Sequence, residues 1–379
     1  MAQGPGAPPR ARPAGRRPGL GAMDFSSRAE RYAATHAANE ELLSWLRQEE
    51  LEPVLEPELP IVDPHHHLWD QRLIASKFPY RQKVYTLHEV LEDVNDGHNV
   101  VGTVYVQAGS FYWRQGPKEF RPVGEVEYCQ GVAAACEAGI YGRSRDSFSR
   151  VCWGIQGTCD LHDPNAEAVL KQMMMSRNFR GVRAAGPYDE AFKQGFRLLE
   201  KHGLAFDRWH HPSPSYDPEE LPRLKELALE FPGVTIVLDH LGGAVGPKMG
   251  GAEMEARWRK DLTELAAACP NVYCKVGGIQ MVINGFELEK RPKPIGSEEL
   301  AELTYPWYSH AIEAFGASRC MFESNFPVDK DCVSYRVLWN AFKLVAAKKG
   351  LSEAEKRDIF HDTAVRVYKL KPTGPHSVL

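Results

Sequence analysis

The sequence lacks the features that mark membrane, nucleic-acid-binding and zinc-ribbon proteins. No apolar run reaches the roughly 18 residues that a transmembrane helix needs, and the mean hydropathy is −0.40. The 46 Lys and Arg residues are balanced by 50 Asp and Glu residues, for a net charge of −4. This balance leaves no excess of positive charge for nucleic acid or an anionic membrane. The eight cysteines form no C-x-x-C pair, which argues against zinc ribbons and thioredoxin-like redox sites.

The N-terminal segment lacks the features of a secretory signal. Residues 1–22 are rich in Pro, Gly and Arg and contain neither an acidic residue nor an apolar core. We expect a flexible tail there, or a chain that starts at Met23, in a cytoplasmic protein whose cysteines are small buried residues. Residues 23–57 are predicted to form a helix at 24–50 and a proline-rich connector, and residues 371–379 a C-terminal tail.

The rest of the chain, residues 58–370, alternates between short β-branched runs and longer helical stretches. Eight strands are predicted, at 61–66, 99–107, 150–156, 179–183, 204–209, 233–238, 271–276 and 319–324. Helices are predicted at 86–95, 124–138, 164–175, 189–202, 217–230, 251–269, 298–316, 333–349 and 352–360. Eight β/α units predict an α/β fold, a (β/α)8 TIM barrel with an N-terminal helical extension. A doubly wound open sheet is the alternative, but no G-x-G-x-x-G follows the first strand and no P-loop is present.

Three consecutive histidines end the first predicted strand, in the segment IVDPHHHLWD. Alternate residues of a strand share a face, so Asp63, His65 and His67 are expected to point one way and His66 the other. At the mouth of a barrel, two imidazoles can bind one divalent cation or present two donors to a substrate oxygen. A purely structural histidine cluster is the alternative.

A further histidine, His240, ends the sixth predicted strand in VTIVLDHLGG. His240 shares strand parity with Leu238, and the two glycines follow where the backbone must turn. We therefore expect His240 at the same end of the barrel as His65 and His67. A buried histidine bonded to a neighbouring carbonyl is the alternative.

An ordered series of six segments goes beyond these generic patterns: DPHHHLWD, RGVR, GLAFDRW, LDHLGG, NVYCKVGG and MFESNFPVD. Together they resemble the amidohydrolase superfamily, specifically the amidohydrolase-related group that contains L-fuconolactonase, L-rhamnonolactonase and 2-pyrone-4,6-dicarboxylate lactonase. The resemblance spans roughly residues 58–370. It implies a (β/α)8 barrel, which agrees with the independent strand count.

The resemblance implies roles for three histidines and exposes one departure. His65 and His67 match the family's H-x-H on strand one, and His240 matches its strand-six histidine. On strand eight the family usually reads G-S-D-W-P, with the aspartate as general base or metal ligand. This chain has Asn325 in place of that aspartate. A carboxamide accepts no proton and binds a hard cation less well than a carboxylate does.

Three interpretations of this departure stay open. In the first, the base has moved, either to Glu323, which shares strand parity with Asn325, or to Asp329 in the following loop. In the second, a histidine is the base and Asn325 orients water or substrate. In the third, the barrel binds a ligand without turning it over. A buried carboxylate that only pairs with an arginine or lysine is a structural alternative for Glu323.

Four further residues are candidates for contacts with substrate. Gln107 ends the second strand, and Tyr112 lies in the long loop after it. Arg183 ends RGVR and matches a family position suited to an anionic or hydroxylated substrate, with a structural salt bridge as the alternative. Lys275, in YCKVGG, is either a charged site residue or the partner of a carboxylate.

The resemblance implies a hydrolase that opens a small sugar-acid or carboxylated lactone by water attack on the ring carbonyl. His65, His67 and His240 would polarise the carbonyl, either directly or as ligands of one divalent metal ion, zinc or manganese. A carboxylate would move the proton of the water. A non-oxidative decarboxylase and a catalytically impaired small-molecule binder are the rival functions. The expected partner is a small-molecule substrate, with no nucleic acid and no membrane, and a homo-oligomer is left open.

Overall fold

The computed structural model describes residues 38–371, apart from 73–79, 140, 142–148, 211–216, 244–245 and 249. The predicted tail at 1–22 and the first half of the helix predicted at 24–50 lie outside the described residues. Within the second half of that prediction, the structure has α2 (Glu40–Leu46). All of the predicted C-terminal tail except Lys371 also lies outside the described residues.

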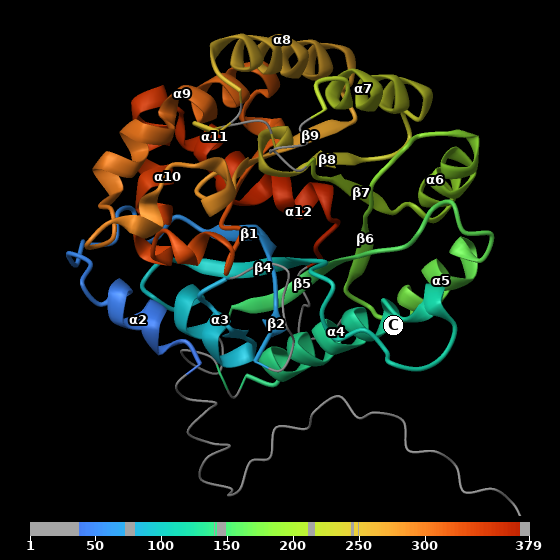
Figure 1. The fold of residues 1–379 in the computed structure, drawn as a ribbon, viewed down its shortest axis with the longest axis horizontal. Helices are drawn as coiled ribbons and strands as arrows, with labels where there is room; N and C mark the ends of the chain where they lie inside the picture. Colours follow the sequence, from blue (N-terminus) through green and yellow to red (C-terminus); the bar gives the residue numbers. More distant parts are fainter. Residues whose placement is uncertain are drawn as a thin grey trace, which may run out of the picture. The chain divides into compact units, whose positions relative to one another are not determined.

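Eight parallel strands form one sheet that follows chain order (Figure 1). They are β1 (Ile61–His66), β4 (Val100–Val106), β5 (Arg150–Gly157), β6 (Phe179–Arg183), β7 (Ala205–Arg208), β8 (Ile236–Leu238), β9 (Val272–Gly277) and β10 (Cys320–Glu323). A parallel bridge between His66 and Phe326 joins the first strand to the segment that follows the last one. The sheet therefore nearly closes into a barrel. All eight predicted strands are confirmed, and the open-sheet alternative is wrong.

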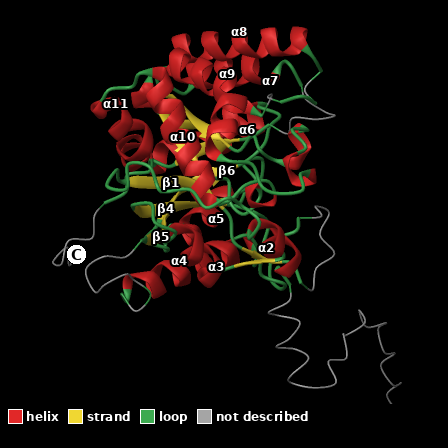
Figure 2. Ribbon diagram, turned by 90° about the vertical axis from the view of Figure 1, so that its left-hand side faces the viewer, coloured by secondary structure: helices red, strands yellow, loops and turns green. Residues whose placement is uncertain are grey.

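Helices surround the barrel on its outside (Figures 1 and 2). They are α3 (Leu87–Val94), α4 (Val123–Glu137), α5 (Ala166–Met173), α6 (Glu190–His202), α7 (Glu220–Glu230), α8 (Ala252–Ala268), α9 (Ser297–Phe315), α10 (Tyr335–Lys349) and α11 (Glu353–Arg357). Helix α6 shows how local sequence sets these bounds. The Asp189 carboxylate accepts a hydrogen bond from the Phe192 amide at its start, and Gly203 ends it in a left-handed conformation.

The helix predicted at 352–360 differs from the observed structure. Helix α11 is followed by a π-helical turn (Asp358–Asp362) and then by α12 (Thr363–Val367), which the sequence pattern did not predict. Val367 and Tyr368 pack against barrel residues such as Val104 and Met321 in a small apolar core. We call residues 363–371 the C-terminal plug, because α12 and the residues after it close the N-terminal end of the barrel. Polar side chains nearer the C-terminal ends of the strands therefore lie above a packed apolar layer, the floor of the barrel interior.

Two smaller features complete the fold. The loop after β1 contains an antiparallel pair, β2 (Trp69–Asp70) and β3 (Val84–Tyr85), that was not predicted. The eight cysteines are free and buried, as expected. Among the described residues, no helix combines the length and apolarity needed to span a membrane.

Candidate active site

The two histidines of the H-x-H segment converge where β1 ends. His67 Nδ1 lies 2.7 Å from the carbonyl oxygen of Val106. Because a carbonyl only accepts, this nitrogen donates and His67 Nε2 carries the lone pair. His65 Nε2 lies 3.2 Å from His67 Nε2. The backbone amide of His67 donates to the Phe326 carbonyl at 2.7 Å, which ties the segment to the loop after strand eight.

Asp63 does not follow the same strand parity. The pairing register between β1 and β4 shifts after Asp63, where Pro64 has no amide hydrogen for the ladder. The Asp63 carboxylate accepts hydrogen bonds from Ser324 Oγ at 2.6 Å and from the Tyr335 hydroxyl at 3.1 Å. The expectation that Asp63 points the same way as His65 and His67 is therefore wrong.

Glu323, the last residue of β10, links the histidines of two strands. Its Oε1 accepts from the His240 backbone amide at 3.0 Å and lies 2.7 Å from His240 Nδ1. Its Oε2 lies 2.8 Å from His65 Nδ1. The three side chains are buried, and the rings of His65 and His240 have centroids 4.5 Å apart. The carboxylate thus orients both imidazoles through Nδ1 and leaves each Nε2 for other partners.

A left-handed turn, rather than strand parity, directs His240 into this site. His240 has a φ of 52°, just past the end of β8. Leu238 packs in the core between strands and helices, whereas Val237 lies in the barrel interior. The close approach of Gly278 also positions the ring, because a Cβ at Gly278 would lie 2.0 Å from His240 Nδ1. The parity argument reached the right location for His240 by the wrong route.

A charged layer lies directly beneath the histidines. Lys275 Nζ, fully buried, lies 2.7 Å from Asp207 Oδ2, 2.9 Å from Asp239 Oδ1 and 3.3 Å from His65 Nδ1. The Tyr368 hydroxyl of the C-terminal plug donates to Asp207 Oδ2 at 2.8 Å. Lys275 is therefore the partner of two carboxylates, one of the two alternatives that the sequence left open.

Burial and charge shift the pKa values of these groups in opposite directions. Burial lowers the pKa of His65 to about 4, with a further contribution from Lys275. Burial alone would raise the pKa of Glu323, but His240 and His65 outweigh it and bring that pKa to about 2. Burial raises the pKa of Asp207 to about 7, although Lys275 opposes the shift. At neutral pH the site thus holds a neutral His65 beside an ionised Glu323.

Asn325 and Asp329 form a pair beyond the end of β10. Asn325 Nδ2 donates to Asp329 Oδ1 at 2.9 Å, and Asp329 Oδ2 is buried without a hydrogen-bond partner. Burial raises the pKa of Asp329 well above its usual range. The Asn325 backbone amide donates to the His65 carbonyl at 2.9 Å. Asn325 therefore braces the loop against β1, whereas Glu323 is in contact with both His65 and His240.

Three of the four predicted substrate-contact residues, Arg183, Gln107 and Tyr112, lie along one edge of the mouth. Arg183 Nη2 donates to the Gln107 carbonyl, and its Nη1 lies 3.9 Å from Asp239 Oδ2. Gln107 Nε2 donates to the Tyr112 hydroxyl at 2.9 Å. Tyr112 also lines a cavity of about 610 Å³ formed by the loops after β4, β5 and β6. This volume lies within the range of about 300–1,000 Å³ that small-molecule sites occupy.

Comparison with known proteins identifies the family. The amidohydrolase family matches this chain over residues 62–370, which is most of its length. The chain belongs to the amidohydrolase family. The barrel predicted from the strand count and the group resembled by its motifs are thereby confirmed.

Relatives and solved structures of this amidohydrolase are similar over most of the barrel. The uncharacterized protein y4mH of Sinorhizobium fredii is 30% identical over 348 residues, which are 83% of this chain and 99% of that protein. L-fucono-1,5-lactonase of Burkholderia ambifaria is 27% identical over 242 residues, 61% of this chain and 74% of the lactonase. A solved amidohydrolase from Burkholderia multivorans with bound zinc has a TM-score of 0.61 at 22% identity, and the match covers 82% of this chain and 99% of that one.

The donors in this amidohydrolase fit one divalent metal ion. His67 presents an Nε2 lone pair, and the Glu323 carboxylate beside His65 Nδ1 favours the same tautomer for His65. The two lone pairs then face each other across 3.2 Å. Two nitrogen ligands of one tetrahedral zinc, at bonds of about 2.0–2.1 Å, are separated by about 3.3 Å. Ligand atoms of His65, His240 and Glu323 also lie within 4.8 Å of one another.

Sequence reasoning missed three residues of this amidohydrolase's site. Asp207 and Asp239 each stand at the C-terminal end of a barrel strand, in GLAFDRW and LDHLGG, so their position was a usable signal. Tyr368 gave no signal, because nothing in the sequence pattern places the C-terminal plug inside the barrel. The network of contacts around Lys275 depends on all three.

Proposed function

We propose that this amidohydrolase hydrolyses the ester bond of a small sugar-acid lactone at the His65, His67, His240 and Glu323 cluster. The observation that carries the proposal is the position of Glu323, whose two carboxylate oxygens approach the Nδ1 atoms of His65 and His240. A relative 27% identical to this chain is named L-fucono-1,5-lactonase, which supports a lactone as the substrate class.

Glu323 enables His240 to act as the proton carrier. Both oxygens of Glu323 face histidine nitrogens, so the carboxylate is already engaged. With its Nδ1 held by Glu323, His240 keeps Nε2 for a water molecule. In this proposal, the water oxygen attacks the ring carbonyl carbon while His240 Nε2 takes a proton from that water. The same nitrogen returns the proton to the leaving alkoxide, and the hydroxy acid is released. Glu323 stabilises the imidazolium in between.

His65 and His67 are proposed to hold one divalent ion, zinc or manganese, through their Nε2 atoms. Such an ion supplies Lewis-acid polarisation of the lactone carbonyl when it is bound. Elemental mass spectrometry of the purified protein tests this part separately. Because the donor set fits one ion, we expect about one ion per chain in the wild type. We expect this ion to be lost in the His65→Ala/His67→Ala variant. Equal metal content in the two proteins would contradict the assignment.

Substrate selection is assigned to the polar edge of the mouth. Arg183, Gln107 and Tyr112 form a continuous chain of contacts there, and Tyr112 opens onto the 610 Å³ cavity. Guanidinium, amide and phenol groups suit the hydroxyl and carboxylate groups of a sugar acid. The ring oxygens of a lactone would lie toward the histidines, and its hydroxylated substituents toward this edge.

The test is ring opening of a panel of five- and six-membered sugar-acid lactones, followed as acid release with a pH indicator in weak buffer. We expect turnover by the wild type and a fall in kcat of about 10²–10⁴ in Glu323→Gln, the range for loss of acid–base catalysis. Glu302→Gln, an exposed carboxylate paired with Lys348 on the outer helices, is the matched control. Absence of turnover for every lactone, or release of CO2 from an aromatic acid instead, would refute the proposal.

A further inference from the structure

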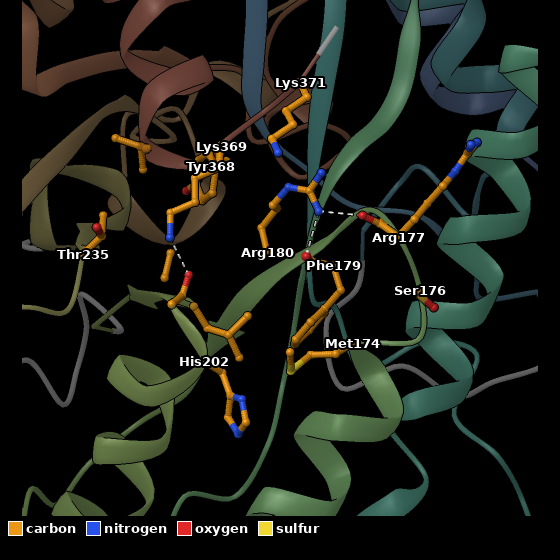
Figure 3. Close-up of a pocket in the computed structure, with 14 residues that line it drawn as sticks. Met174, Ser176, Arg177, Phe179, Arg180, His202, Thr235, Tyr368, Lys369 and Lys371 are labelled. Carbon is orange, nitrogen blue, oxygen red and sulfur yellow. Dashed lines mark hydrogen bonds between the residues drawn. The ribbon is translucent and has the colours of Figure 1, made fainter. Parts of the chain in front are cut away.

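A second cavity opens at the end of the barrel opposite the active site. It has a volume of about 420 Å³ and lies between the starts of β6 and β7 and the C-terminal plug (Figure 3). Arg177, Arg180, Lys369 and Lys371 line it together with His202, and among the described residues no Asp or Glu does. This excess of positive charge contrasts with the paired charges around the histidine cluster. The sequence motif RGVR contributes Arg183 to the active site and Arg180 to this cavity.

Arg180 is fixed in the cavity wall with donor capacity left over. Its Nη1 donates to the carbonyls of Arg177 at 2.7 Å and Phe179 at 2.8 Å. Its Nε is buried without a hydrogen-bond partner. No described Asp or Glu forms an ion pair with it, although burial lowers its pKa. A desolvated guanidinium that is held by two carbonyls and lacks a counter-charge is an anchor for an anion.

The other cationic side chains of the cavity differ in whether they already have an ion-pair or hydrogen-bond partner. Arg177 pairs with Glu137, and in Figure 3 its side chain runs away from Arg180. Lys369 Nζ donates to the Gly203 carbonyl at 2.7 Å. Lys371 forms no ion pair with a described residue, and Figure 3 shows its side chain reaching toward Arg180. Two like charges from separate segments thus face the same space, which is unfavourable unless an anion lies between them.

We propose that this cavity binds a small phosphate-class anion, held by Arg180 from β6 and Lys371 from the C-terminal plug. The rigid guanidinium matches the tetrahedral oxygens of phosphate, and the flexible ammonium adds a point charge. The cavity is at the opposite end of the barrel from Arg183 and the histidines, so the ligand is separate from the lactone substrate. A bound anion bridges the plug to the sheet and stabilises their contact.

The plug gives this site a connection to the charged layer of the barrel. Tyr368 lines the cavity, and its hydroxyl donates to Asp207, the partner of Lys275. An anion that holds the plug in place therefore also supports the floor on which the histidines rest. The proposal does not depend on the lactone chemistry, since it concerns other residues and another opening.

Isothermal titration of the full-length protein with sodium phosphate, against sodium chloride at equal ionic strength, tests the proposal. We expect saturable binding that weakens by about tenfold in Arg180→Gln, the size of one lost charge-assisted contact. Lys371→Gln, at an exposed position, should weaken it several-fold. Lys260→Gln, on the exposed face of α8 where Lys260 Nζ lies 3.8 Å from Glu264, is the control and should bind as the wild type does.

Three results would overturn the proposal. The first is the absence of binding at a phosphate concentration of about 10 mM, because a dissociation constant above that value would be too weak for a specific site. The second is equal affinity in the wild type, Arg180→Gln and Lys371→Gln, which would place the phosphate elsewhere, for example at Arg183. The third is equal weakening in Lys260→Gln, which would show a nonspecific charge effect. Circular dichroism checks the fold of Arg180→Gln. If Arg180→Gln is unfolded, the affinity of the exposed variant Lys371→Gln for phosphate tests the proposal instead.

Discussion

Replacing Lys275 by methionine should destabilise the barrel strongly, because it removes the only described cation in contact with both Asp207 and Asp239. The Lys275 ammonium lies 2.7 Å from one carboxylate and 2.9 Å from the other, and all three side chains are buried. Methionine fills nearly the same volume, so the change removes charge with little change in packing. The main effect is then electrostatic.

The magnitude follows from what is left behind. Breaking a buried ion pair by removing one partner costs about 3–5 kcal/mol, since the other charge stays buried without compensation. Two carboxylates are left here, so we expect a loss near the upper end of that range. Asp207→Asn removes one of the two stranded charges and keeps an oxygen for the Tyr368 hydroxyl. The double variant K275M/D207N should therefore be more stable than K275M by about 1–3 kcal/mol, the size of coupling between residues in contact.

Urea unfolding at pH 7 and 25 °C, followed by tryptophan fluorescence and by far-UV circular dichroism, measures these differences. Lys260→Met, at an exposed position on α8, is the control and should change the free energy of unfolding by less than about 0.5 kcal/mol. Unchanged stability of K275M would refute the electrostatic account. So would a double variant whose loss equals the sum of the two single losses, since that would show no coupling between Lys275 and Asp207.

Three further predictions concern other parts of the barrel. Asn325→Asp places a second carboxyl beside a buried one, so it should lower the free energy of unfolding by about 1–3 kcal/mol without raising lactone turnover; a gain in kcat would contradict the role given to Asn325. Gly278→Ala forces a Cβ to 2.0 Å from His240 Nδ1 at a φ of +66°, so kcat should fall at least about tenfold. Gly350 also has a positive φ, but no atom lies within 4 Å of an added Cβ, so Gly350→Ala should lower stability without lowering kcat. Equal kcat values in the two variants would refute the positioning argument. Burial raises the pKa of Glu125 to about 7, so the native state binds its proton more tightly than the unfolded chain. Stability should therefore fall as pH rises from about 4.5 to 7, by up to ~3 kcal/mol from this group; thermal melting across that range should show a shallower slope in Glu125→Gln, and parallel curves would contradict the shift.

The strands of the barrel could be predicted because each is a short apolar or β-branched run between turn residues. The run at 179–183 matches β6 at both ends. The prediction at 233–238 began three residues before β8, since the Val234 amide is bonded to the Phe231 carbonyl in a turn. Strands β2 and β3 have two residues each, too few for a periodic pattern. The π-helical turn before α12 likewise has no sequence signal.

The site shows where local reasoning ends. Alternation along β1 was enough to bring His65 and His67 together, because that geometry depends on adjacent residues. The contact of Lys275 with Asp207 and Asp239 joins three different strands, and it needs the register of the closed sheet. The position of His240 needs a left-handed turn, which strand parity cannot describe. Residue types were therefore easier to predict than the backbone that directs them.

The backbone at the end of β10 explains why Asn325 is tolerated in place of the family's aspartate. Glu323 is the last residue of the strand and points into the barrel, where its side chain reaches both His65 and His240. Asn325 lies beyond the strand with a φ of 55°, a conformation that asparagine tolerates better than most residues. There its amide group braces Asp329, and its backbone amide holds β1. Of the three interpretations of Asn325, this geometry favours the one in which a histidine is the base, because both oxygens of Glu323 already lie beside the Nδ1 atoms of His65 and His240.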